Sequence, residues 1–116
     1  MRDSIRAMTS FRVHGSVVED ESGRPLAAML VRVYDKDLAL DDFLGEARTD
    51  DAGRFEVTFT EDRFKDLLES RPDLYLQVLD PRGIRLLHTT ADRVRFNAGH
   101  DEFFELRIAR ERVLES

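Results

Sequence analysis

The sequence contains no cysteine and no tryptophan, and only two of its 116 residues, Lys36 and Lys65, are lysine. The lack of cysteine excludes disulfides and thiolate chemistry, and with them the usual scaffold of small secreted domains. No apolar run approaches the roughly 18 to 20 residues that a membrane-spanning helix needs, so no membrane span is expected. The start, MRDSIRAMTS, lacks the apolar core of a signal peptide. We therefore expect a cytoplasmic location, with export by a dedicated secretion system left open.

A net excess of positive charge is also missing. The chain has 24 acidic and 18 basic residues, which gives a formal net charge of -6. Binding to a phosphate backbone requires a basic face, so we expect no nucleic-acid partner. The length fits one domain, and the hydrophobic fraction of 41% is enough for a core without covalent staples.

What the sequence does contain is a series of short apolar runs, each followed by glycine or proline. In RFEVTFT, residues Phe55, Val57 and Phe59 alternate strictly with polar residues, and FRVHGSVVED, MLVRVYD, DLYLQVLD and EFFELRIAR show related alternation. Period-two alternation with turn signals predicts an all-β fold, a seven- to eight-stranded antiparallel β-sandwich over residues 11–109. In the last run, Phe103 and Phe104 fall on opposite faces, so one ring must point away from the core.

Two segments do not show this alternation of apolar and polar residues. TEDRFKDLLESRPD places Phe64, Leu67 and Leu68 at helical spacing before Pro72, which predicts one short helix around residues 61–69. The ends, residues 1–10 and 110–116, are expected to be flexible termini. For ARERVLES, a short helix is the alternative.

Three longer stretches carry a family resemblance: VHGSVVEDESGRPLAAMLVRVYDKD, LGEARTDDAGRFEVTF and RPDLYLQVLDPRG. Together they resemble the transthyretin-like (prealbumin-like) β-sandwiches and their carboxypeptidase-regulatory-like relatives, from about Phe11 to Ile108. The resemblance implies a non-catalytic module that binds a protein or acts as an adaptor, and it allows for a place in a larger bacterial assembly. It implies no enzymatic activity and a protein partner, and it leaves room for homo-oligomers formed through an edge strand.

The stretch VYDKDLALDDFLG concentrates acidic residues between two apolar runs, and its aspartates are Asp35, Asp37, Asp41 and Asp42. It is similar to the third calcium loop of C2 domains, which implies a calcium-dependent binding domain with these aspartates as metal ligands. Ca²⁺ takes six to eight oxygen ligands, so further groups would have to join them. The alternative is a solvated loop without a cofactor, in which Asp35 and Asp37 hold turn amides.

Two enzyme families share part of their residue sets with this chain. In the hydroxyisourate hydrolases, a transthyretin-like branch, a first-strand histidine and an arginine after a turn correspond to His14 and Arg54, but the terminal Y-R-G-S is absent. Intradiol dioxygenases, which are also β-sandwiches, bind iron through two tyrosines and two histidines. The chain contains these residue types without the family's spacing, at Tyr34, Tyr75, His88 and His100.

Overall fold

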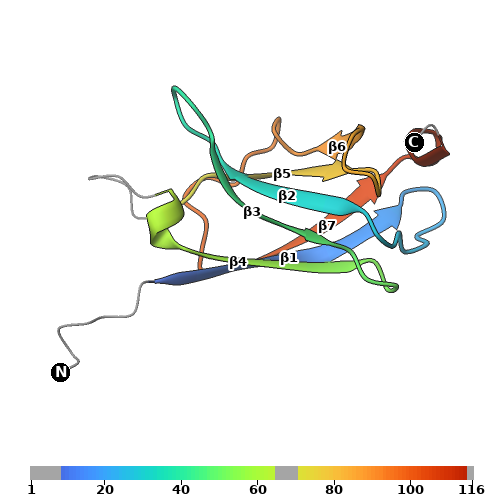
Figure 1. Ribbon diagram of the computed structural model, residues 1–116, viewed down its shortest axis with the longest axis horizontal. Coiled ribbons are helices and arrows are strands. Elements are labelled where there is room, and N and C mark those ends of the chain that lie inside the picture. The colour runs from blue at the N-terminus through green and yellow to red at the C-terminus, as the bar shows by residue number, and fades with distance from the viewer. Residues whose placement is uncertain (1–8, 65–70, 115–116) are drawn as a thin grey trace.

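A computed structural model describes residues 9–64 and 71–114 of the chain and shows two packed β-sheets (Figure 1). The three-stranded sheet has the order β4-β1-β7, and its strands are β1 (Ser10–Glu19), β4 (Arg54–Thr60) and β7 (Asp101–Ile108). The four-stranded sheet has the order β3-β2-β5-β6, and its strands are β2 (Leu30–Asp35), β3 (Asp42–Arg48), β5 (Leu74–Leu79) and β6 (Leu86–Thr89). The all-β sandwich predicted from the sequence is consistent with this arrangement.

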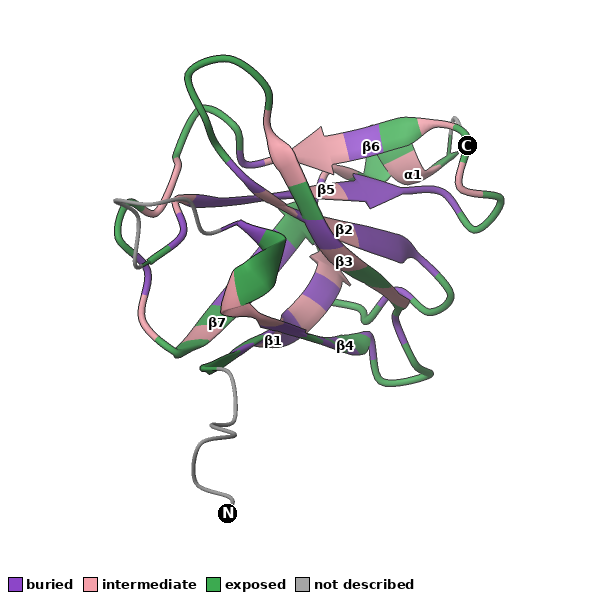
Figure 2. Cartoon of the chain, turned by 60° about the vertical axis from the view of Figure 1, so that its left-hand side comes forward, coloured by how far each residue is buried: buried purple, intermediate pink, exposed green. Residues whose placement is uncertain are grey.

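The core lies between the two sheets and is built from the alternating apolar positions. Phe55, Val57 and Phe59 of β4 are all buried, while their polar neighbours on the strand are exposed or half-exposed. Figure 2 shows the same alternation of buried and exposed residues along the strands. The prediction for the paired aromatic residues is also confirmed, because Phe104 is 4% exposed and Phe103 is 56% exposed. Period-two burial therefore decides which side chains reach the outer faces of the sheets.

The expectation of antiparallel pairing throughout is wrong at one strand pair. Strand β1 pairs antiparallel with β4 but parallel with β7, in a register that places Arg12 opposite Asp101. The chain reaches β7 after leaving β6 of the other sheet, so no tight hairpin fixes the direction in which β7 must run. The parallel pairing brings the start of β7 alongside the first half of β1.

Helical structure is limited to two short elements in the described residues. These are the 3-10 turn η1 (Glu61–Arg63) and the helix α1 (Arg110–Leu114). The helix predicted around residues 61–69 falls largely on residues 65–70, which lie outside the described residues. The short-helix alternative for ARERVLES agrees with α1. None of the helices in the described parts of the chain is long and apolar enough to cross a membrane.

Candidate functional site

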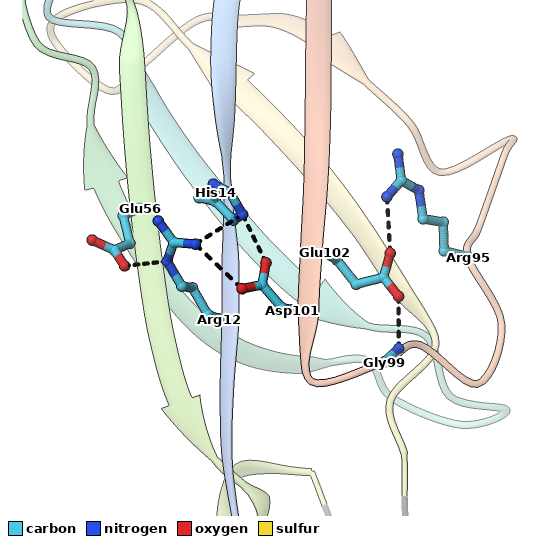
Figure 3. Close-up of polar contacts among 7 residues, drawn as sticks. All are labelled: Arg12, His14, Glu56, Arg95, Gly99, Asp101 and Glu102. Carbon is cyan, nitrogen blue, oxygen red and sulfur yellow. Dashed lines mark hydrogen bonds and ion pairs between the residues drawn. The ribbon is translucent and has the colours of Figure 1, made fainter.

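A cluster of polar side chains lies on the outer face of the β4-β1-β7 sheet. Arg12 and His14 come from β1, Glu56 from β4 and Asp101 from β7, and Figure 3 shows them pointing toward one another. Arg12 and His14 share this face because they are two residues apart on one strand. We call these four residues the His14 site.

The centre of the His14 site is a close contact between an imidazole and a carboxylate. His14 Nε2 lies 2.7 Å from Asp101 Oδ1. Arg12 Nη1 lies 3.0 Å from His14 Nε2 and 3.3 Å from Asp101 Oδ2. Arg12 Nε donates a hydrogen bond of 2.5 Å to Glu56 Oε2, which holds the guanidinium beside the histidine.

These contacts favour one tautomer of His14. An ionised carboxylate can only accept hydrogen bonds, so the nearer partner, Asp101, requires a proton on Nε2. Nδ1 of the neutral ring is then left with its lone pair and can accept a proton from a bound molecule. A histidine oriented by a carboxylate in this way has the geometry of a general base.

The electrostatics of the site keep Asp101 ionised. The hydrogen bond from His14, followed by that from Arg12, lowers the pKa of the Asp101 carboxyl below its usual range. The side chains are solvent-exposed, with Asp101 at 60% and Arg12 at 44%, so these pairs contribute little to stability. Folding stability is therefore a weak explanation for this arrangement.

The cluster opens onto a hollow of about 810 Å³ that is also lined by Ser16, Arg54 and Phe103. The exposed Phe103 ring meets the His14 ring edge-to-face, with a centroid distance of 5.4 Å. The volume is within the range of small-molecule sites, and an exposed aromatic ring beside polar groups is a common surface for a planar ligand.

The site depends on the close approach of β1 and β7, which Gly15 permits. A Cβ atom at this position would lie 1.8 Å from the Phe104 carbonyl oxygen. Only glycine fits there, since no side chain can occupy the space taken by the neighbouring backbone. Gly15 thus holds the strand of His14 against the strand of Asp101.

The four aspartates predicted as metal ligands are engaged by the protein itself. Asp35 is fully buried and accepts the Asp73 amide at 2.7 Å. Asp37 accepts the Leu38 amide at 2.7 Å, as expected for a residue that holds a turn amide, whereas the amide that Asp35 accepts belongs to another part of the chain. Asp42 begins β3 opposite Asp35.

The remaining member, Asp41, accepts the Asp37 amide at 3.0 Å and the Tyr75 hydroxyl at 2.5 Å. These bonds, that from Asp37 first, lower the pKa of Asp41. Among the described residues, no group of three or more histidine, cysteine or acidic side chains is placed to hold a metal ion. The metal-ligand role of Asp35, Asp37, Asp41 and Asp42 stays a prediction.

The residues that could form a two-tyrosine, two-histidine iron site are spread over the molecule. Tyr34 and Tyr75 stack at 5.2 Å and belong to paired positions of β2 and β5. His100 stacks on Phe11 at 4.5 Å, and His88 lies in β6. Every histidine and tyrosine of the chain is among the described residues. The side chains therefore do not fit this type of iron centre.

Comparisons with known proteins address the fold. No protein-family model matches the sequence. No curated protein matches it either. Among solved structures, a 9R-lipoxygenase from Cyanothece PCC8801 is similar with a TM-score of 0.62 and 23% identity, over 84% of this chain and 16% of the lipoxygenase. This chain thus corresponds to a small part of that protein.

Two further solved structures have the same fold over most of this chain. The dioxygenase domain of a dioxygenase carbohydrate-binding protein fusion from Streptomyces sp. SirexAA-E has a TM-score of 0.55 and 16% identity, over 89% of this chain and 81% of that one. Hydroxyquinol 1,2-dioxygenase from Pseudomonas putida DLL-E4 has a TM-score of 0.53 and 13% identity, over 90% of this chain and 58% of that one. At such identities the likeness establishes a shared fold.

These findings correct several predictions made from the sequence. The assignment to transthyretin-like and carboxypeptidase-regulatory-like domains, with a C2-like loop, is wrong, because the structural neighbours are dioxygenases. Alternating apolar residues with glycine corners specify a sandwich and not a family. The predictions of a non-catalytic protein-binding or adaptor module, and of a chain that is not an enzyme, are overturned by the same neighbours.

The cofactor prediction, none or Ca²⁺, is likewise wrong on this comparison, since dioxygenase neighbours give calcium no support. The sequence shows the carboxylates of this acidic stretch but not the groups that they contact in the fold. Asp35 and Asp41 face donors from other parts of the chain, the Asp73 amide and the Tyr75 hydroxyl, and the sequence spacing does not show these contacts.

Only part of the His14 site can be recognised in the sequence. His14 stands out as a strand histidine, but no sequence pattern connects Arg12, Glu56 and Asp101 to it. Asp101 is 87 residues away along the chain, and the parallel pairing of β1 and β7 that joins them departs from the predicted topology. The alternation of Arg12 and His14 on one strand face is the available clue.

Proposed function

We propose that this chain is a folded unit of an oxygenase-class enzyme, and that its His14 site binds a small acidic enol or phenol and accepts its proton. The oxygenase class is supported by the dioxygenase structures that share the fold. The observation that carries the site is the 2.7 Å contact between His14 Nε2 and Asp101 Oδ1, beside Arg12 in an open hollow.

The chemistry proceeds from the contacts of the site. A hydroxyl group of the ligand donates to His14 Nδ1, and the ring takes the proton while Asp101 stabilises the imidazolium that forms. Arg12 and Arg54 line the same hollow and offer positive charge to the ligand oxygen that has become anionic. Phe103 supplies an aromatic surface for the ligand ring.

Iron takes no part in these steps. Tyr34 and Tyr75 stack on each other, while His14, His88 and His100 have other neighbours, so no step of oxygen chemistry is placed on these residues. Binding and proton transfer can be measured without a metal, and they form the first test.

The test is an anaerobic absorption titration of the full chain with hydroxyquinol at pH 7. We expect saturable binding with a new phenolate band, because His14 takes up the ligand proton. His14→Gln should lose most of the band, while His100→Gln, whose ring stacks on Phe11, should keep it.

Binding without a phenolate band, or a band that survives His14→Gln, would contradict the role of His14. The oxygenase class is tested separately by oxygen uptake with the same ligand. Uptake that depends on His14 would support the class, and its absence would leave only the binding site.

A further inference from the structure

A second hollow, of about 470 Å³, lies where β6 of one sheet faces β7 of the other. Its lining includes His88 of β6, Phe104 and Leu106 of β7, and the loop residues Arg93 and Arg95. None of these belongs to the His14 site. The volume is within the range of sites that hold small organic ligands.

The lining carries positive charge on a chain that is acidic overall. Arg107 is neutralised by Asp20 at 2.7 Å and Glu105 at 3.1 Å. Arg95 Nη1 pairs with Glu102 Oε1 at 3.0 Å, as Figure 3 shows, but Glu102 is not part of the lining.

Arg93 differs from these two arginines. Its backbone amide donates to Thr90, but among the described residues its guanidinium has no carboxylate partner. One cation at the hollow is therefore left without a counter-ion from the described parts of the chain.

The half-buried His88 is affected by the charge of Arg93. Burial lowers the pKa of His88, and the charge of Arg93 lowers it further. Arg112 acts in the same direction and Asp92 opposes them. The ring is held neutral at pH 7 beside an uncompensated cation, an arrangement that a bound anion would relieve.

The lining also has an apolar part, formed by Phe104 and Leu106, beside the polar residues Asp20, Thr90 and Glu105. The Arg95 guanidinium carbon lies 3.6 Å from the centroid of the Phe104 ring, which is 4% exposed. Leu106 is 2% exposed beside it. A cation at the rim and an apolar wall together favour a ligand with one anionic group and a flat hydrophobic body.

We propose that this hollow binds a small organic carboxylate, whose anionic group pairs with Arg93 and whose apolar body lies against Leu106 and Phe104. The inference is independent of the proposed function, because it involves no residue of the His14 site.

The test is a side-chain ¹⁵N NMR titration of the full chain with sodium benzoate, followed at the three histidines. We expect saturable shifts at His88 with little change at His14 and His100. Bound benzoate should also raise the pH at which His88 titrates, since a nearby anion favours the charged imidazolium. Benzamide, which has the same ring without the charge, should leave the His88 signals in place.

Arg93→Gln should weaken benzoate binding about tenfold or more, the size expected for the loss of a charge-assisted hydrogen bond. Arg93→Lys should retain most of the affinity, and Arg82→Gln should leave it unchanged because that substitution removes the same charge outside the lining. Arg93 is exposed, so its replacement should not prevent folding; melting curves of the variants check this.

Several results would overturn the proposal. They are the absence of a saturable shift at His88, an equal response to benzamide, equal shifts at all three histidines, or an affinity that Arg93→Gln leaves intact. Failure of the phenolate test at His14 would have no bearing on these readouts, so the two proposals can fail separately.

Discussion

At the scale of single residues, the His14 site depends on which neighbour accepts the hydrogen bond from His14 Nε2. Asp101 lies closer to His14 than Arg12 does, 2.7 Å against 3.0 Å, and it is an acceptor while Arg12 is a donor. Arg12 is in turn held by Glu56. The pair of carboxylates keeps the guanidinium beside the imidazole, where it can interact with a ligand anion.

A second carboxylate, Glu19, gives a prediction about stability. It is 3% exposed at the end of β1, and it accepts a hydrogen bond of 2.6 Å from Ser22 and one of 3.1 Å from Arg110. The Ser22 hydroxyl, then Arg110, lowers the pKa of Glu19 from 4.5 to about 2. A carboxyl with a lower pKa in the folded state stabilises the fold above its unfolded pKa, and this contribution is lost as the pH falls through the folded value.

We therefore expect Glu19→Gln to melt at a lower temperature than the wild type at pH 6. The difference between the two melting temperatures should shrink as the pH falls from 4.5 to 2. Thermal unfolding across this pH range measures the effect. Glu111→Gln, an exposed position in α1, is the matched control and should follow the wild type at every pH. A difference in melting temperature that stays constant over this pH range would show that Glu19 acts by packing and not by its charge.

At the scale of elements, the parallel pair β1–β7 is the feature on which the site depends, and Gly15 tests it. Gly15→Ala should lower the free energy of unfolding by about 3 kcal/mol or more, because the new methyl group overlaps the Phe104 backbone. Gly23→Ala is the control. Gly23 has a φ of 76° and nothing lies within 4 Å of the position that an added methyl group would take, so only about 1–2 kcal/mol of backbone strain is expected. Urea unfolding measures both, and a wild-type stability for Gly15→Ala would contradict the pairing.

The strands also show which features of the fold could be predicted from the sequence. Burial of Phe55, Val57 and Phe59 followed from strict alternation, because a strand has only two faces. The direction of β7 did not follow, since no local signal in EFFELRIAR distinguishes a parallel from an antiparallel neighbour. The contact between His14 and Asp101 is a consequence of that direction, so it could not be predicted.

At the scale of the whole molecule, the fold places two polar hollows on the sandwich. The His14 site lies on the outer face of the β4-β1-β7 sheet, and the second hollow, lined by His88, Arg93 and Phe104, lies where β6 faces β7. Both are lined by arginines on a chain whose net charge is -6. Some of the acidic residues that dominate the total accept backbone amides away from these hollows, as Asp35 and Asp37 do.

The tautomer of His14 is the property that most directly tests the proposed site, and it can be read from the side-chain ¹⁵N NMR spectrum of the free protein under conditions where the ring is neutral. We predict that the proton resides on Nε2, directed at Asp101, and that Asp101→Ala abolishes this preference. A His14 ring with its proton on Nδ1, or one that Asp101→Ala leaves unchanged, would contradict the contact between His14 and Asp101 and the site built on it.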